Sequence, residues 1–207
     1  MKKLILSFFF ILIFVSAYSQ KTATDYLNSG IAKEGLHDNK GALQDYDKAI
    51  ELKSDYAEAY YHRGIVKRKL DNNTDAIKDF TKIIALQPKS GEGYYSRSEA
   101  YGKSGKLNEA LTDINKSIEL VSDNGQAYNN RGIIFSMSGK YQEAVNDFTK
   151  SLQLKPDNIG AFTNRALAYK GMAKYSEALD DMMTAKEKGI AVDEYEINNL
   201  KKLAGKN

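Results

Sequence analysis

Residues 125–158 read GQAYNNRGIIFSMSGKYQEAVNDFTKSLQLKPDN, and their pattern recurs every 34 residues along most of the chain. The alanine at position 144 has counterparts at 42, 76, 110 and 178. An aspartate follows each alanine by three residues, and a bulky apolar residue follows it by four. A fixed period of this length predicts a stack of identical supersecondary units. Such stacks expose a long surface that serves docking far more often than catalysis.

Each repeat is predicted to form two helices. In the second repeat, residues 57–70 and 75–86 carry apolar side chains at helical spacing, and the polar segment 71–74 separates them. In the third and fourth repeats this turn holds Gly105 and Gly139, which suit a left-handed backbone at the end of a helix. The two helices must cross closely, so small residues are expected opposite the recurring alanine. These are Gly30, Gly64, Ser98, Gly132 and Ala166.

The recurring residues resemble those of tetratricopeptide repeat (TPR) proteins. The fourth repeat supplies the full motif with Tyr128, Gly132, Phe135, Ala144, Phe148, Ser151 and Pro156. Lys33 and Lys67 depart from it, because they replace the second aromatic residue. The resemblance implies an all-α, right-handed superhelical solenoid of antiparallel helix pairs.

The predicted organisation covers the whole chain. It comprises a signal peptide at 1–19, a short segment at 20–22, five repeats (23–56, 57–90, 91–124, 125–158 and 159–192) and a capping helix with a tail at 193–207. In the capping helix, Tyr195, Leu200 and Leu203 are expected to pack against the last repeat. Glu194 and Glu196 are expected to face water, because a terminal repeat needs a polar outer side.

The first residues predict export from the cytoplasm. Lys2 and Lys3 precede an apolar run at 4–15, and small residues at 17 and 19 fit cleavage after Ser19. The alternative is an uncleaved membrane anchor, but the run is shorter than the roughly 20 residues that a spanning helix requires. The mature protein is therefore expected in the periplasm or outside the cell.

Composition excludes several functions. The chain has no Cys and only two His, and its formal net charge is +3. Thiol chemistry is therefore excluded, a histidine metal centre is disfavoured, and a basic surface for nucleic acid is absent. No phosphate-binding glycine loop, zinc-protease motif or serine-hydrolase motif occurs. We expect no catalytic residue, metal or cofactor.

Four of the five arginines occupy one position of the repeat: Arg63, Arg97, Arg131 and Arg165. Arginine at a fixed position suggests that its planar, bidentate guanidinium is needed there. The first repeat has Ser29 instead and has no predecessor. We therefore predict pairing with the preceding repeat, as Asp45–Arg63, Asp79–Arg97, Asp113–Arg131 and Asp147–Arg165. Such pairs would penalise stacking in the wrong register more than they would add stability.

The resemblance also indicates where a ligand binds, since the first helices of such arrays line a concave wall that holds peptides. The wall residues predicted to contact a partner are Tyr61, His62, Arg68, Tyr95, Asn129, Asn130 and Asn164. Other positions assigned to the wall include Glu99, Lys103, Ile133 and Met137. Tyrosine gives a large contact area with little loss of entropy. A clamp for chaperone carboxyl termini is disfavoured, because tyrosine or asparagine stands where its lysines would be.

The sequence therefore predicts a non-catalytic module that binds a peptide or a partner protein. One alternative is a scaffold that assembles an envelope complex through self-association or the edges of the solenoid. Another is a small-ligand receptor or an accessory subunit of an enzyme. The oligomeric state and the partner are left open by the sequence.

Overall fold

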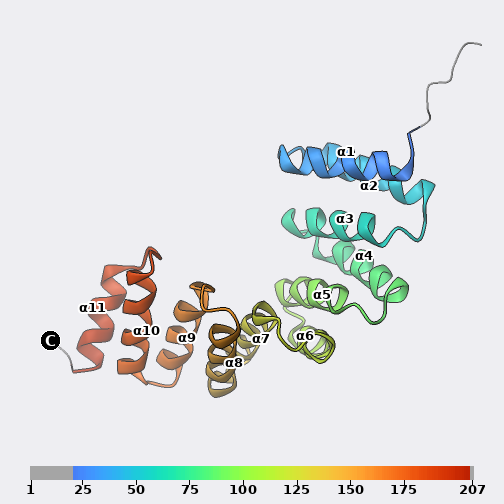
Figure 1. The fold of residues 1–207 in the computed structure, drawn as a ribbon. Coiled ribbons are helices and arrows are strands. Elements are labelled where there is room, and N and C mark those ends of the chain that lie inside the picture. Colours follow the sequence, from blue (N-terminus) through green and yellow to red (C-terminus); the bar gives the residue numbers. More distant parts are fainter. Residues whose placement is uncertain (1–20, 206–207) are drawn as a thin grey trace, which may run out of the picture. The chain divides into compact units, whose positions relative to one another are not determined.

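The computed structural model describes residues 21–205 and is entirely helical over that range. The predicted signal peptide lies outside the described residues. The helices are α1 (Ala23–Gly35), α2 (Asn39–Leu52), α3 (Ala57–Lys69), α4 (Asn73–Leu86), α5 (Gly91–Lys103), α6 (Leu107–Leu120), α7 (Gly125–Met137), α8 (Tyr141–Leu154), α9 (Gly160–Gly171), α10 (Tyr175–Glu187) and α11 (Glu194–Leu203). Figure 1 shows them as successive short helices. The prediction of an all-α fold of antiparallel helix pairs with a C-terminal helix is confirmed.

The chain divides into two compact units, with the border after Val66 in α3. Unit 1 contains α1, α2 and most of α3, and unit 2 contains the end of α3 and α4–α11. Each unit is described by itself below. None of the helices within residues 21–205 combines the length and the apolar character that a membrane span requires.

Polar residues in the sequence start several of the helices. Thr22 and Asp25 form a reciprocal capping box at α1, with the Thr22 amide donating to Asp25 at 2.8 Å. Asp38, Asn72 and Asn124 cap α2, α4 and α7 by accepting backbone N–H groups. These side chains satisfy amides that have no partner inside the helix. The start of each of these helices is therefore determined by residues close to it in the sequence.

The turn inside each repeat uses a left-handed residue. Gly105 and Gly139 have φ values of 72° and 73°, which confirms the prediction for the third and fourth repeats. The amide of Lys106 donates to the Tyr101 carbonyl, and the amide of Gly105 donates to the Gly102 carbonyl. This is the Schellman pattern, which ends a helix and reverses the chain. His37, Asp71 and Ala173 adopt positive φ in the turns of the other repeats.

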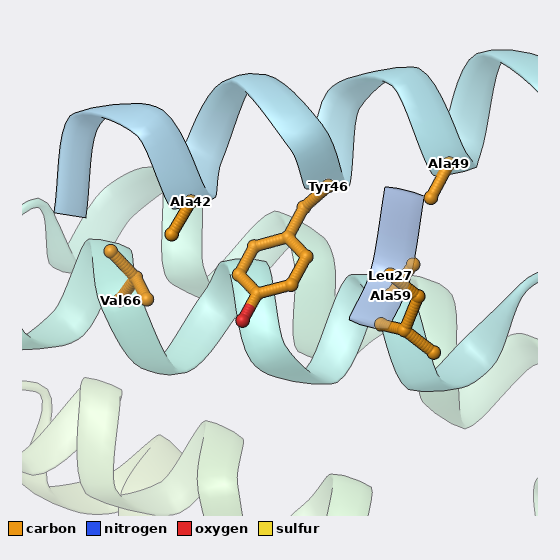
Figure 2. Packing of buried hydrophobic residues seen from close by; sticks show 6 residues of the cluster. All are labelled: Leu27, Ala42, Tyr46, Ala49, Ala59 and Val66. Atoms are coloured by element: carbon orange, nitrogen blue, oxygen red, sulfur yellow. The ribbon is translucent and has the colours of Figure 1, made fainter. Parts of the chain in front are cut away.

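The core of unit 1 is arranged around Tyr46. Figure 2 shows this side chain directed from α2 toward α3, with Ala42 and Ala49 beside it on α2 and Val66 and Ala59 on α3. Tyr46, Ala42 and Ala49 have no exposed surface. A Cβ on Gly30 would lie 2.5 Å from the Tyr46 ring, so α1 approaches α2 closely only because this position is glycine.

Unit 2 repeats the same arrangement. Ala110, Ala144 and Ala178 are fully buried, and Ile114, Phe148 and Met182 are nearly so. A Cβ on Gly132 would lie 2.6 Å from Phe148, the residue 16 positions later. The small residues of the first helices thus pack against the bulky residues of the second helices.

The final helix covers the last repeat with different residues from those predicted. Leu200 is buried at 1% exposure as expected, but Ile197 is its buried companion. Tyr195 and Leu203 are 76% and 46% exposed, so the prediction that they pack inward is wrong. Ile197 and Leu200 lie three residues apart on one side of α11, whereas Tyr195 lies on the other. Glu196 also differs from expectation, because it accepts from Lys170 at 2.7 Å.

Candidate functional site

Three of the recurring arginines, Arg97, Arg131 and Arg165, pair with the aspartate of their own repeat. The Arg131 guanidinium donates from Nε to Asp147 Oδ2 at 2.7 Å and from Nη2 to Asp147 Oδ1 at 2.8 Å. Arg97 with Asp113 and Arg165 with Asp181 have the same two-bond geometry. In each case the hydrogen bond with the aspartate raises the arginine pKa, so the guanidinium keeps its positive charge.

The predicted pairing with the preceding repeat is therefore wrong for Arg97, Arg131 and Arg165. The bidentate pairs Asp79–Arg97, Asp113–Arg131 and Asp147–Arg165 do not form, because each arginine binds the aspartate of its own repeat instead, whereas the Asp45–Arg63 pair stays a prediction. Asp45 is engaged by Ser29 and Lys33 of its own repeat. The physical reason is the close contact of the two antiparallel helices within a repeat. This contact brings Arg131 of α7 next to Asp147 of α8, 16 residues later.

A third N–H group of each arginine does reach the preceding repeat. Nη1 of Arg97 donates to Thr81 at 3.0 Å, Nη1 of Arg131 to Asn115 at 2.8 Å, and Nη1 of Arg165 to Thr149 at 2.9 Å. In unit 1, Nη1 of Arg63 is 2.6 Å from Asp47, which occupies the corresponding position. The arginines thus join consecutive repeats, but through a single bond.

Lysine side chains also bind the recurring aspartate in the first two repeats. Lys33 Nζ lies 2.6 Å from Asp45, and Lys67 Nζ lies 2.8 Å from Asp79. Both lysines stand where the repeat motif has its second aromatic residue. The sequence marks them only as departures from that motif, whereas in the structure each of them neutralises a buried carboxylate.

Asp45 provides a prediction on pH. Burial raises the pKa of Asp45, but hydrogen bonds from Lys33 and Ser29 more than offset this, so its pKa lies below the usual value. A lowered pKa stabilises the fold above the unfolded value of about 3.9, and this contribution is lost as the pH falls through the folded value. We expect Lys33→Met to raise the Asp45 midpoint in a carboxyl ¹³C NMR titration. An unchanged midpoint would contradict the role of Lys33.

The first helices of unit 2 form one continuous surface. Helices α5 and α7 contact each other, and α7 contacts α9. We call the surface of α5, α7 and α9, together with Arg68 at the end of α3, the first-helix face. Four polar contacts tie it together: Asn130 Nδ2 donates to Tyr95 Oη at 2.8 Å and to Glu99 at 3.2 Å, Arg68 lies 3.2 Å from Glu99, and Asn164 donates to Asn129 at 3.2 Å.

The predicted partner-binding residues of unit 2 therefore lie on this face, with one difference. Tyr95, Asn130 and Asn164 are partly exposed, but Asn129 is only 5% exposed and supports Asn164 from beneath. Burial raises the pKa of Tyr95, and the Glu99 carboxylate adds to the shift. Tyr95 therefore keeps its proton and can both donate and accept a hydrogen bond at any physiological pH.

Tyr61 and His62 belong to unit 1 and form a separate cluster. The His62 ring stacks on Tyr46 at 5.7 Å between centroids and meets Tyr61 edge-on at 5.5 Å. His62 Nδ1 lies 3.5 Å from Glu34 Oε2, the atom to which Tyr46 Oη donates at 3.0 Å. His62 is thus held by aromatic packing and by a carboxylate.

The first-helix face contains a cavity of about 340 Å³ between α5 and α7. It is lined by Arg68, Ser98, Glu99, Gly102, Lys103, Asn130, Ile133, Ile134 and Met137. The wall positions predicted from the sequence include Arg68, Glu99, Lys103, Asn130, Ile133 and Met137. Sequence reasoning missed Ser98, Gly102 and Ile134. Across residues 21–205, no cluster of His, Asp and Glu side chains is suited to hold a metal ion.

Family models match the repeats directly. Models described as tetratricopeptide repeat or TPR repeat match residues 37–71, 57–90, 91–124 and 125–158. Together they span 37–158, which is more than half of the chain. The chain belongs to the tetratricopeptide repeat family. Proteins of this family are generally non-catalytic and act in protein interactions.

Solved TPR structures resemble this chain over most of its length. The MamA protein is 25% identical, with a TM-score of 0.70, and the match covers 83% of this chain and 97% of MamA. YrrB, described as a TPR protein with an unusual peptide-binding site, is 25% identical, with a TM-score of 0.68 and coverage of 87% and 92%. PilF of Pseudomonas aeruginosa shares the fold at 16% identity, with a TM-score of 0.77 and coverage of 89% and 85%. No curated protein matched the sequence.

Proposed function

We propose that this TPR protein is a non-catalytic interaction module that binds a peptide or a partner protein on its first-helix face. The observation that carries the proposal is the cavity of about 340 Å³ on that face, bordered by polar side chains on helices that touch one another. Asn130 lines the cavity and donates to Tyr95, and these two residues and Asn164 of the same face offer the donors and acceptors that an extended peptide backbone requires. The description of YrrB as peptide-binding supports the same assignment.

Tyr61 and His62 are a separate proposed contact for a partner, within unit 1. Their rings meet edge-on, and Tyr61 is partly exposed. Aromatic side chains are enriched at protein interfaces because they bury a large area at a small entropic cost. We therefore propose that both residues contact a partner on unit 1.

The proposed place of action is outside the cytoplasm. Lys2 and Lys3, the apolar run at 4–15 and the small residues at 17 and 19 support export with cleavage after Ser19. Intact-mass measurement of the protein from a periplasmic or secreted fraction is expected to give a chain beginning at Gln20. A chain that keeps Met1 in that fraction would contradict cleavage.

Affinity capture from envelope extracts tests the binding function. We expect the wild-type chain to retain a partner that the double variant Tyr61→Ala, Tyr95→Ala loses. Tyr195→Ala is the matched control, because Tyr195 is a 76% exposed tyrosine on α11, far along the sequence from both. Circular dichroism checks that each variant is folded. Equal recovery of the same partner by the wild type and the double variant would refute a binding surface built on these tyrosines.

A further inference from the structure

The cavity between α5 and α7 includes one position at which the third repeat lacks a side chain. Gly102 lies in the last turn of α5 and lines the cavity. The same position of the other repeats holds Glu34, Arg68, Ser136 and Lys170. A Cβ placed on Gly102 would meet nothing within 4 Å. The position therefore opens onto empty space, which we call the Gly102 pocket.

One side of the Gly102 pocket is apolar. Ile133, Ile134 and Met137 of α7 line it, and Met137 is 56% exposed. Covering a solvent-exposed methionine and two neighbouring isoleucines with an aliphatic side chain lowers the free energy, because apolar surface is removed from water. The volume of about 340 Å³ is at the low end for ligand sites, so it suits a side chain and its neighbour rather than a large cofactor.

The lining of the pocket has more hydrogen-bond donors than carboxylates to accept from them. Glu99 is already engaged by Arg68 and by Asn130. By contrast, Arg68 Nε is buried and has no hydrogen-bond partner among the described residues. Lys103 Nζ lies 4.0 Å from Asp71, the outer limit of an ion pair, and its side chain is 49% exposed. The lining therefore holds two cations, Arg68 and Lys103, against the single carboxylate of Glu99, so an occupant that supplies a carboxylate is favoured.

Ser98 adds a second buried polar group to the lining. It is 1% exposed, and its Oγ has no hydrogen-bond partner within the described part of the chain. The pocket therefore combines an aliphatic side with an excess of positive charge from Arg68 and Lys103. This combination fits neither a purely apolar ligand nor a basic one.

We propose that the Gly102 pocket binds an aliphatic side chain, leucine or methionine, of a partner segment in which an aspartate or glutamate comes next. The carboxylate of that acidic residue faces Arg68 and Lys103, and the aliphatic side chain covers Ile133 and Met137. The segment is internal to the partner, because the first-helix face continues past the pocket to Asn164 on α9 and leaves room for more chain. This inference rests on the proposed function and specifies the ligand of the same face.

A methionine NMR experiment tests the proposal on the full-length chain. With ¹³C-methyl methionine labelling, the Met137 signal is expected to shift saturably on adding acetyl-Gly-Ser-Leu-Glu-Ser-Gly-amide. Met172, Met182 and Met183 lie outside the pocket and should not respond. A matched peptide with Gln in place of Glu is expected to bind about tenfold more weakly, since it lacks the charge-assisted bond. A peptide with Ala in place of Leu is also expected to bind more weakly.

Filling the pocket provides the decisive variant. Gly102→Leu is expected to abolish the Met137 response while leaving the helix content unchanged, since its Cβ enters open space. Gly160→Leu is the matched control, because a Cβ at Gly160 also meets nothing within 4 Å and lies outside the pocket. Gly102→Ala serves as a milder variant that should remain folded and bind more weakly than the wild type.

Each other outcome overturns the proposal. Binding that persists in Gly102→Leu, or equal affinity for the Glu and Gln peptides, would refute the pocket assignment. A stronger response to a peptide that ends in a free leucine carboxylate would refute the internal segment, and an equal response to isovalerate would refute a peptide ligand. The affinity capture reports on binding through Tyr61 and Tyr95 and does not depend on the Gly102 pocket, so a failure of the pocket assignment is distinguishable from a failure of the proposed function.

Discussion

Replacement of Phe148 by alanine is expected to lower the free energy of unfolding by about 3–5 kcal/mol. Phe148 is 1% exposed and packs on Gly132, where a side chain would leave no room for the ring. Removing the ring leaves a cavity that the helices α7 and α8 cannot fill without moving together. The stability is measured by urea unfolding followed with circular dichroism.

Tyr195→Ala is the control for this prediction. Tyr195 is also aromatic and lies on a helix, but it is 76% exposed, so its removal creates no cavity. We expect little change in the unfolding midpoint for that variant. Similar losses for Phe148→Ala and Tyr195→Ala would contradict a core organised around the recurring bulky residue.

The second large effect is expected at Arg131. Arg131→Met removes both hydrogen bonds to Asp147. Because Asp147 is only 6% exposed, its carboxylate is then buried without a cation. Breaking a buried pair from one side is expected to cost about 3 kcal/mol. Adding Asp147→Leu should recover much of this loss, because no charge is then left buried. Urea titrations of the single and double variants measure the difference.

Lys116→Met is the matched test on an exposed pair. Lys116 lies 2.6 Å from Glu119, but both side chains are well exposed, so this pair should leave stability unchanged within error. A double variant Arg131→Met, Asp147→Leu that is less stable than Arg131→Met would show that Asp147 does not need its partner. It would therefore contradict the interpretation of the arginine position.

The sequence predicts the helices well because their signals are local. Residues such as Gly139 and Asn124 specify a turn and a helix start through their own backbone and side chain, with no help from distant parts of the chain. The buried positions follow in the same way, since Ala144 and Phe148 recur with the helical period. These features can be predicted because the same residues recur in each repeat.

The arginine pairs could not be assigned from the same repetition. In a chain of period 34, the aspartate of each repeat and that of the repeat before it recur equally regularly around each arginine. Spacing alone therefore does not distinguish Arg131–Asp147 from Arg131–Asp113. The choice is made by the close antiparallel contact of α7 and α8, which is a tertiary feature.

The Gly102 pocket was also not predicted from the sequence, although the glycine itself is an exception at its position of the repeat. Gly102 is the one glycine at a position that elsewhere holds Glu34, Arg68, Ser136 and Lys170. A glycine inside a helix costs stability and suggests a reason such as close packing or an open site. Its neighbours on α7 could be recognised only once α5 and α7 were seen in contact. Deviations from a repeat can thus be more informative about binding than the repeated residues.

The direction of the arginine bonds bears on how such an array changes in length. The two strong bonds of Arg131 go to Asp147, and both residues lie within 125–158, the segment matched by one repeat model. A duplicated copy of that segment would bring its own cation and its own carboxylate, and a deleted copy would take both away. Only the bond from Nη1 to Asn115 would need a new acceptor, and Thr81 and Thr149 show that either an amide or a hydroxyl serves. Whole repeats can therefore be gained or lost by recombination without leaving an orphaned charge in the interior.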